Sequence, residues 1–274
     1  QVEILAIERA KKLFHCDHAN VQPLSGAAAN IATYFAWLEP GDTVLGMDLG
    51  HGGHLTHGAP VTYMGKIFNF IRYKTILETG EVDFAEVRRL AHESKPKIVL
   101  CGFSAYPRDL DYGKFKEIAD EVGAITMADV AHIAGLIAGG VLKNPFDYGF
   151  NIVTTTTHKT LRGPRGAMIL SRGIVGNPLK SLEKTVENIP TLIDRSIFPG
   201  FQGGPHMHQI ASIAVALHEA SLPEFKEYAK QVVKNAKVLA NELLGYGWKL
   251  VTGGTDNHIV LCDSIASKNM SGKE

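Results

Sequence analysis

The run Thr154-Thr155-Thr156-Thr157-His158-Lys159-Thr160 places a lysine at the polar end of an expected β-strand, Ile152–Thr157. β-Branched threonines favour a strand and offer their hydroxyl groups to a polar pocket. A lysine amine attacks a carbonyl group only when it is unprotonated, and burial or neighbouring charges can lower its pKa enough. We therefore predict that Lys159 forms a Schiff base; the alternative is an ordinary surface lysine.

On both sides of this strand, short apolar runs alternate with longer stretches of helical periodicity, which is typical of an α/β layer fold. The other expected strands are Thr43–Asp48, Lys97–Gly102, Ala124–Asp129 and Ala167–Ser171. The expected helices are Ala27–Leu38, Asp83–Glu93, Tyr112–Val122, Met207–Ala220 and Pro223–Leu244, with a further one from Val2 to Phe14. We predict a mixed, mostly parallel sheet flanked by helices.

The expected domain boundary lies at residue 222. Residues 1–222 would form a large ligand-binding domain. Residues 223–274 would form a long helix and the start of a small α+β C-terminal domain, with a hairpin of Trp248–Val251 and His258–Cys262. The chain does not begin with methionine, and its last four residues could open another helix. We therefore expect a segment of a longer protein.

Charge and composition exclude several classes of protein. In a chain of 274 residues, Lys+Arg and Asp+Glu both number 28, so the net charge argues against nucleic acid or an anionic membrane as the main partner. No apolar run is long enough to span a bilayer, and no secretory signal opens the chain. Cys16, Cys101 and Cys262 are far apart and lack CxxC spacing, which indicates reduced thiols and a cytoplasmic protein.

Polar residues follow the expected strands at their carboxyl ends, where ligands gather in such folds. These residues are Asp48, Ser104, Asp129 and Lys159. Asp129 could hold a proton on a pyridine nitrogen, which makes the ring a better acceptor of electrons. The alternative role for Asp129 is to cap the next helix. His132 would either reach the ring's phenolic oxygen or pack in the core.

Two further segments suit a phosphate-bearing ring. Ser25-Gly26-Ala27 opens a helix whose free N–H groups and dipole attract a phosphate, although Ser25 could merely cap that helix. A glycine-rich loop carries His51, His54 and His57. We favour an imidazole stacked on an aromatic cofactor; a metal site is the weaker interpretation, because zinc ligands usually have more constrained spacing. Arg165, in the turn after the lysine, either binds an anion or holds the turn.

The chain carries, in this order, the motifs SGxxAN, HGGHLTHG, FSAYPR, ADVAHIAG, TTTTHKTLRGPRG, FPGFQGGP and GGTDNH. In this combination it resembles the serine hydroxymethyltransferase family, among the fold-type I, aspartate-aminotransferase-like enzymes that use pyridoxal 5'-phosphate. The resemblance implies a transferase that interconverts L-serine and glycine, with tetrahydrofolate accepting the one-carbon unit as 5,10-methylenetetrahydrofolate. It also implies a homodimer or homotetramer with the active site at the subunit interface.

The resemblance assigns roles to individual residues. Lys159 would carry the cofactor as a Schiff base, Asp129 would pair with the ring nitrogen, and His54 would stack on the ring. Ser104 and His132 would lie near the phenolic oxygen of the cofactor. Thr156 and His158 would flank the lysine and assist its exchange with the substrate amine. The phosphate would be held by Ser25, Gly26 and Ala27, with Gly203 and Gly204 from a second subunit; the folate would be bordered by Leu49, Gly53, His54 and Leu55.

Two departures from the family pattern affect these expectations. Ala27 stands where the motif SGSxAN usually has a serine, so one hydroxyl donor to the phosphate is missing and we expect weaker cofactor retention. The family's upstream glutamate and tyrosines, and its downstream arginine for the substrate carboxylate, have no counterpart in this chain. A molecule that lacked them would turn over poorly or not at all.

Three other functions fit parts of the pattern. Another fold-type I enzyme, an aldolase or an aminotransferase, would share Lys159 and Asp129 but would not need folate. A second alternative is a non-catalytic segment that binds pyridoxal phosphate or a partner subunit without turnover. The third is hydrolysis at a metal held by the histidine loop, which predicts bound zinc and loss of activity with a chelator.

Overall fold

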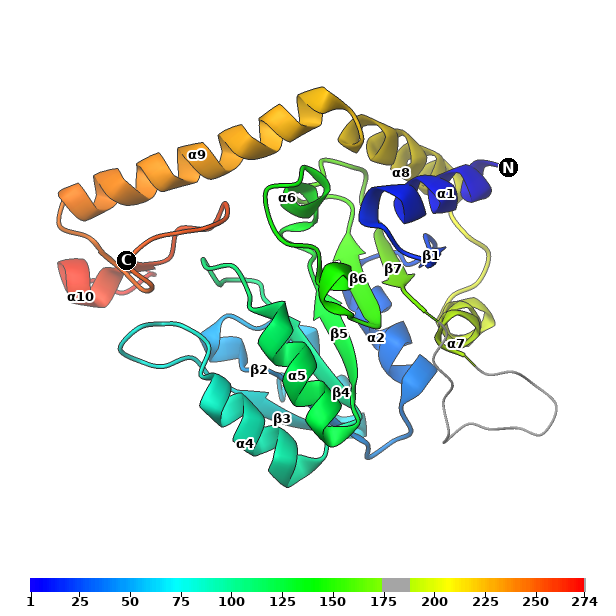
Figure 1. The fold of residues 1–274 in the computed structure, drawn as a ribbon, viewed down its shortest axis with the longest axis horizontal. Helices are drawn as coiled ribbons and strands as arrows, with labels where there is room; N and C mark the ends of the chain where they lie inside the picture. The colour runs from blue at the N-terminus through cyan, green and yellow to red at the C-terminus, as the bar shows by residue number, and fades with distance from the viewer. Residues whose placement is uncertain (174–187, 274) are drawn as a thin grey trace.

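A seven-stranded sheet forms the centre of the molecule, with the strand order β1-β7-β6-β5-β4-β2-β3 (Figure 1). The structure is a computed structural model, and it describes residues 1–173 and 188–273. Strands β2 to β6 run parallel, and β7 is antiparallel to both of its neighbours, β6 and β1. The strands are β1 (His18–Asn20), β2 (Thr43–Met47), β3 (Asn69–Tyr73), β4 (Ile98–Gly102), β5 (Ile125–Asp129), β6 (Ile152–Thr156) and β7 (Ala167–Ser171).

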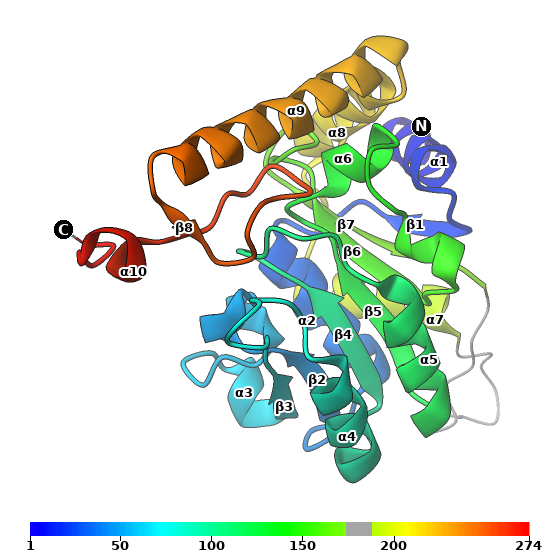
Figure 2. The same ribbon diagram turned by 60° about the vertical axis from the view of Figure 1, so that its left-hand side comes forward.

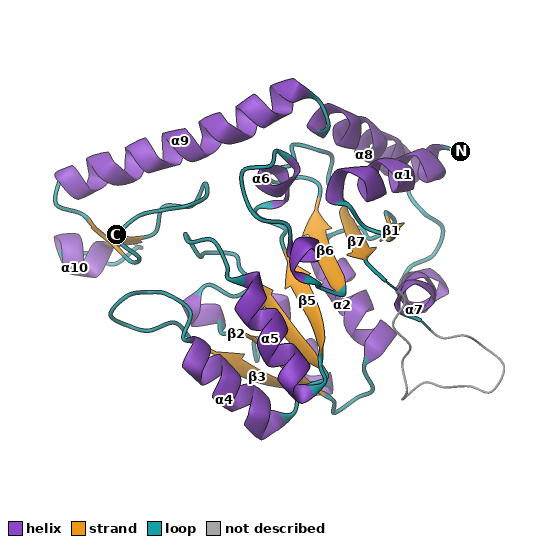
Figure 3. Cartoon of the chain, in the orientation of Figure 1, coloured by secondary structure: helices purple, strands orange, loops and turns teal. Residues whose placement is uncertain are grey.

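Helices cover both faces of this sheet (Figure 3). One face packs against α2 (Gly26–Trp37), α3 (Met64–Ile67) and α7 (Ile189–Arg195). The other face packs against α1 (Val2–Phe14), α4 (Phe84–Ser94), α5 (Tyr112–Val122), α6 (Ala134–Ala138), α8 (Met207–Ala220) and the buried side of α9 (Pro223–Gly245). The short turns η1 (Leu49–His51), η2 (Leu55–His57), η3 (Pro145–Tyr148) and η4 (Ser196–Phe201) lie in the connections.

The alternation of side chains along each strand explains why the sheet has a core on each face. In β4, Ile98 and Leu100 belong to the core under α2, whereas Val99 and Cys101 belong to the core under α5. Successive residues of a strand point to opposite faces, so a strand covered on both faces can carry apolar residues at successive positions. A continuous apolar run is therefore the signature of such a strand, and all five residues of β4 are buried.

The C-terminal part leaves the sheet along α9 and ends in a second, two-stranded sheet, followed by α10 (Ser264–Lys268; Figure 2). Its strands are β8 (Lys249–Leu250) and β9 (Cys262–Asp263), which pair antiparallel. The expected second strand of this hairpin, His258–Cys262, is therefore wrong except for its last residue. The reason is that the chain before Cys262 turns back onto the large sheet and satisfies its polar groups there.

Several hydrogen bonds make this return contact, which we call the clasp, and three of them involve the side chains of Asp256 and Asn257. Arg108 Nη1 donates to Asp256 Oδ1 at 3.1 Å, and the backbone N–H of Asp109 donates to Asp256 Oδ2 at 3.2 Å. Asn257, which is fully buried, donates through Nδ2 to the carbonyl oxygen of Tyr106 at 3.1 Å. The clasp places the next residue, His258, parallel to the ring of His132, with 6.1 Å between ring centroids.

The five strands and six helices expected from the sequence are confirmed to within one residue at each end, whereas β1 and β3 were not predicted. Among the described residues, no helix is both long enough and apolar enough to cross a membrane. The boundary at residue 222 falls immediately before α9 and stays a prediction.

Candidate active site

A cavity of about 260 Å³ opens at the carboxyl ends of the parallel strands. Ten of its lining residues are among those that the sequence predicted: Ser25, Gly26, Ala27, His54, Ser104, Asp129, His132, Thr156, His158 and Lys159. Three others were not in the predicted set of site residues: Phe103, Ala131 and Arg165. The structure thus brings into one place residues that the chain supplies from α2, η2 and the ends of β4, β5 and β6.

The N-terminus of α2 forms one wall of the cavity. Ser25 caps this helix, because its Oγ accepts a hydrogen bond from the backbone N–H of Ala28 at 3.4 Å. The capping role and the pocket-lining role therefore coexist. A side chain on Gly26 would come within 2.9 Å of Thr156 Cγ2, so the missing side chain lets the helix start against β6. The free N–H groups of this first turn suit an anion.

Asp129, the last residue of β5, is a buried carboxylate with three hydrogen-bond donors. Its Oδ2 accepts from His57 Nε2 at 3.0 Å and from Asn30 Nδ2 at 2.8 Å, and its Oδ1 accepts from the backbone N–H of Ala131 at 3.1 Å. Burial raises the pKa of Asp129, but the hydrogen bonds from His57 and Asn30 outweigh burial and hold this pKa well below its usual range. The group is therefore ionised at neutral pH.

His57 was not assigned a role from the sequence, and the structure shows what it does. Its Nδ1 accepts a hydrogen bond from the backbone N–H of His54 at 3.2 Å, so the ring proton lies on Nε2 and points at Asp129. His57 is 1% exposed and has no access to the cavity. The sequence signal that could have revealed this role was the spacing of three residues between His54 and His57, which places both rings on the same side of the short turn η2.

His54 presents its ring to the cavity. Its Nδ1 accepts a hydrogen bond from the backbone N–H of Thr56 at 3.2 Å, which leaves the proton on Nε2. Burial lowers the pKa of His54, and the nearby carboxylate of Asp129 only partly opposes this effect. The side chain is therefore a neutral, flat ring, as stacking on an aromatic ligand requires.

Lys159 lies in the loop between β6 and β7, half-buried in the cavity wall. Burial lowers the pKa of its amine; the charge of Asp129 opposes this effect, and that of Arg165 adds to it. The loop is closed by a hydrogen bond from the backbone N–H of Thr157 to the carbonyl oxygen of Gly166, at 3.0 Å. A lysine with a lowered pKa on a fixed loop is the arrangement that a Schiff-base lysine needs.

The other predicted pocket residues have protein partners as well. Thr156 Oγ1 donates to the carbonyl oxygen of Ala131 at 3.2 Å, and His158 Nδ1 lies 3.2 Å from the carbonyl oxygen of Gly166. His132 is partly buried, and burial together with the charges of Lys159 and His258 lowers its pKa to about 4. His132 is consequently neutral at physiological pH.

Comparison with known proteins agrees with this geometry. The family model described as serine hydroxymethyltransferase matches residues 1–274. The chain belongs to the serine hydroxymethyltransferase family. It is 55% identical, over 273 residues, to a curated serine hydroxymethyltransferase of Prochlorococcus marinus (strain MIT 9301). That alignment covers 100% of this chain and 61% of the relative, so the chain spans about three fifths of the relative's length. The fold-type I α/β architecture expected for the family is the one observed.

Five residues that the family resemblance assigns to ligands lie outside the cavity. Leu49 and Leu55 are 45% and 46% exposed, which leaves their side chains available to a ligand. Gly53 packs against β2, where a side chain would come within 2.2 Å of the carbonyl oxygen of Met47. Gly203 and Gly204 lie between η4 and α8 and do not line the cavity. Roles of all five in folate or partner-subunit binding stay predictions.

The metal interpretation of the histidine loop concerns His54, His57 and Asp129, whose possible ligand atoms lie within 4.8 Å of one another. These atoms already serve hydrogen bonds: His57 Nε2 donates to Asp129, and His54 Nδ1 accepts from Thr56. A metal ion bound at His57 Nε2 would have to displace its proton and break its contact with Asp129. The geometry therefore supports a hydrogen-bonded arrangement of these three residues.

Proposed function

We propose that the protein containing this chain interconverts L-serine and glycine, with tetrahydrofolate as the one-carbon acceptor and pyridoxal 5'-phosphate on Lys159. One observation carries this proposal: a lysine of lowered pKa and a buried, ionised aspartate line the same cavity of about 260 Å³, with a helix N-terminus in its wall. These groups match the aldehyde, the ring nitrogen and the phosphate of this cofactor.

The residues present fit the cofactor by their chemistry. Ser25, Gly26 and Ala27 would hold the phosphate at the start of α2, Asp129 would hold the proton on the ring nitrogen, and His54 would cover the ring face. Ser104 and His132 would lie near the phenolic oxygen. When bound, pyridoxal phosphate supplies an electron sink for bond cleavage at the α-carbon of an amino acid.

The protein groups then have distinct tasks. Burial keeps a fraction of Lys159 unprotonated, so its amine is able to bind a carbonyl group, and later to hold a proton when the substrate amine takes its place. Asp129 stays ionised and stabilises positive charge on the ring nitrogen. His54, neutral and half-buried, excludes water from the ring face. Thr156 and His158 fix the lysine loop through their contacts with backbone carbonyl groups.

Substrate and partner sites complete the proposal. Leu49, Gly53, His54 and Leu55 would border the folate, for which the exposure of both leucines is favourable. Gly203 and Gly204 would contribute to the phosphate site of a second subunit, which implies a homodimer or homotetramer. We propose a cytoplasmic location on the basis of the reduced cysteines.

The experiment is a visible absorption spectrum of the purified protein with cofactor, before and after borohydride, followed by peptide mass mapping. We expect an absorption band that reduction fixes onto Lys159. The Lys159→Arg variant should lose the band and on the order of 10³ or more in turnover of serine. The matched control is Lys226→Arg on the exposed side of α9, which should change neither.

Three outcomes would replace the proposal. A wild-type protein that never acquires the band is a non-catalytic member of the family. A protein that cleaves serine or threonine equally fast with and without tetrahydrofolate is a related fold-type I aldolase, and one that transfers the amino group is an aminotransferase.

A further inference from the structure

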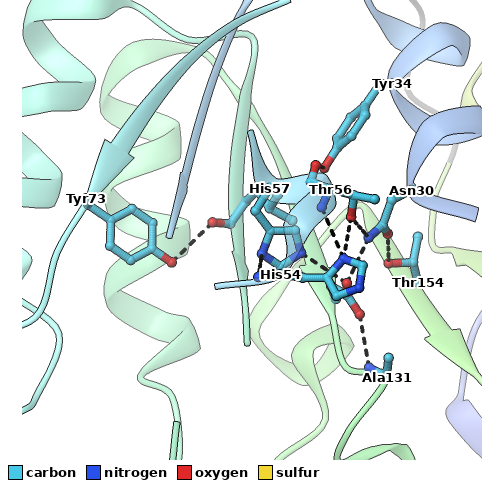
Figure 4. Close-up of polar contacts among 10 residues, drawn as sticks. Asn30, Tyr34, His54, Thr56, His57, Tyr73, Ala131 and Thr154 are labelled. Atoms are coloured by element: carbon cyan, nitrogen blue, oxygen red, sulfur yellow. Dashed lines mark hydrogen bonds and ion pairs between the residues drawn. The ribbon is translucent and has the colours of Figure 1, made fainter. Parts of the chain in front are cut away.

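Asn30 occupies the centre of the polar contacts behind the cavity (Figure 4). It lies in the first turns of α2, its side chain is fully buried, and it does not line the cavity. An amide in such a place needs partners for its oxygen and its nitrogen, because an unpaired buried polar group is costly. Each partner comes from a different segment of the chain.

The orientation of the amide is fixed by Thr154 on β6. Thr154 Oγ1 donates to Asn30 Oδ1 at 2.6 Å, so the oxygen side of the amide faces β6 and its NH₂ group faces the opposite way. That NH₂ group makes two hydrogen bonds of 2.8 Å, one to Asp129 Oδ2 and one to Thr56 Oγ1. One amino group therefore connects the end of β5 to the turn η2.

The contact with Thr56 extends to the ring of His54. Thr56 Oγ1 already accepts from Asn30, and it lies 2.7 Å from His54 Nδ1, so its own proton points to that nitrogen. Since the backbone N–H of Thr56 also points there, His54 is held with its proton on Nε2. The amide of Asn30 thus acts, through one hydroxyl group, on the ring at the cavity wall.

The contact with Asp129 distinguishes the two oxygens of its carboxylate. Oδ2 accepts from both Asn30 and His57, whereas among the described residues Oδ1 accepts only from the backbone N–H of Ala131. Oδ1 therefore keeps the greater capacity for a further donor.

We propose that Asn30 is a positioning residue for the cofactor, which aligns the carboxylate for the ring nitrogen and the imidazole for the ring face through one amino group. This inference rests on the proposed function for the identity of the ligand. Under this proposal, Asp129 Oδ1 is the atom that would contact the ring nitrogen. A change at Asn30 should then affect both the carboxylate of Asp129 and the imidazole of His54.

The decisive variant is Asn30→Asp, which keeps the shape of the side chain. It replaces the amino group that donates to Asp129 and Thr56 by a carboxylate oxygen. We expect cofactor affinity to fall by about tenfold or more, since tenfold corresponds to about 1.4 kcal/mol. We also expect the pH at which the visible band of the bound cofactor changes to move upward by about one unit, because like charges raise a carboxyl pKa. A band and an affinity equal to those of the wild type would overturn the proposal.

The chain offers a matched control. Asn20 is also buried, and its Nδ2 donates to the carboxylate of Asp194 at 2.8 Å, outside the residues that line the cavity. Asn20→Asp should destabilise the fold but leave cofactor affinity and the pH response of the band unchanged. Equal losses in both variants would reduce Asn30 to a merely structural residue.

Thr56→Val separates the effect of Asn30 on His54 from its effect on Asp129. It removes the hydroxyl group between Asn30 and His54 but leaves the contact of Asn30 with Asp129 intact. We expect a loss of cofactor affinity with no change in the pH response of the band. If Asn30→Asp does not fold, a Thr56→Val protein with unaltered affinity contradicts the proposal on its own.

A measurement without cofactor keeps the inference distinct from the proposed function. Nitrogen-15 spectra of labelled histidines should show His54 with its proton on Nε2 in the wild type. In Thr56→Val only the backbone N–H of residue 56 still donates to Nδ1, so the share of the tautomer with its proton on Nδ1 should rise. If the wild type does not bind pyridoxal phosphate, the proposed function fails and these spectra alone decide the role of the network. Identical spectra in both proteins would overturn the positioning of His54.

Discussion

Asp129 keeps its charge in a buried position because three donors replace the water that an exposed carboxylate would have. Burial raises the pKa of this carboxyl group, and the hydrogen bond that His57 donates is first among the contacts that lower it. This pair therefore links the electrostatics of the site to the stability of the fold, and the link is measurable.

We predict that His57→Phe lowers the free energy of unfolding at pH 7 by about 1.5–3 kcal/mol, because a buried charged group loses a donor. In the wild type the pKa of Asp129 lies below that of the unfolded chain, so its contribution persists above about pH 4 and is lost only as the pH falls through the lower value. Without His57 the pKa of Asp129 in the folded protein is higher, so the contribution is smaller and its loss is complete at a higher pH. Urea unfolding at pH 7 and at several values below about pH 4 measures the effect, with exposed His92→Phe as the control; parallel pH curves would contradict it.

A second prediction concerns His132. Its folded-state pKa is about 4, whereas an unfolded histidine titrates near 6.5. Between these values the unfolded chain binds the extra proton, so stability decreases as the pH falls from about 6.5 toward 4. His132→Gln should flatten this part of the stability curve. Proton spectra of His132 give a direct check, and a midpoint near 6.5 in the folded protein would refute the prediction.

Strand ends and a resemblance in motifs sufficed to predict Lys159, Asp129 and His54, and the cavity brings them together. The groups that orient them, His57 and Asn30, were not predicted. Their partners are distant in sequence, since Asn30 and Asp129 are 99 residues apart, so no local pattern reveals the contact. The available signals for Asn30 were its place at the end of the motif SGxxAN and its polar side chain on the buried face of a mostly apolar helix.

Among the elements, the predictable strands are those buried on both faces, because only they require an uninterrupted apolar run. β3 lies at one edge of the sheet and reads Asn-Phe-Ile-Arg-Tyr, with its first residue exposed. β1 lies at the other edge and has three residues, His18 to Asn20. Edge strands are covered less and tolerate polar residues, so their pattern is not distinct from that of a loop.

At the scale of elements we also predict the effect of Gly135→Ala. Gly135 lets α6 approach the lysine loop, and a Cβ there would come within 2.1 Å of the carbonyl oxygen of Thr160. The collision should cost about 1–3 kcal/mol and displace the loop that carries Lys159, so cofactor affinity should fall together with stability. The control is Gly245→Ala at the end of α9, where no described atom lies within 4 Å of the new carbon. Thermal unfolding and cofactor titration test both; an unchanged cofactor affinity in Gly135→Ala would contradict the prediction.

For the molecule as a whole, the clasp connects the C-terminal sheet to the large one. Asp256→Ala removes the acceptor of Arg108 and of the backbone N–H of Asp109, and should cost about 1–2 kcal/mol. Hydrogen exchange should accelerate around Asn257, which would show that the effect is local. The comparison is Asp120→Ala, which breaks an exposed pair with Lys116 and should cost less than about 1 kcal/mol. Uniform acceleration over the whole chain would argue against a local clasp.

The long sequence separations inside the network have a consequence for the order of folding. Thr154 and Asn30 are 124 residues apart, so their contact closes a large loop, and contacts of this kind are slow to form. The helix α2, the turn η2 and the strands β5 and β6 all have to be in place before the cavity exists. During refolding, binding of the cofactor should therefore lag behind the appearance of secondary structure. The rate at which the visible absorption band of the bound cofactor appears would then report the last step of folding.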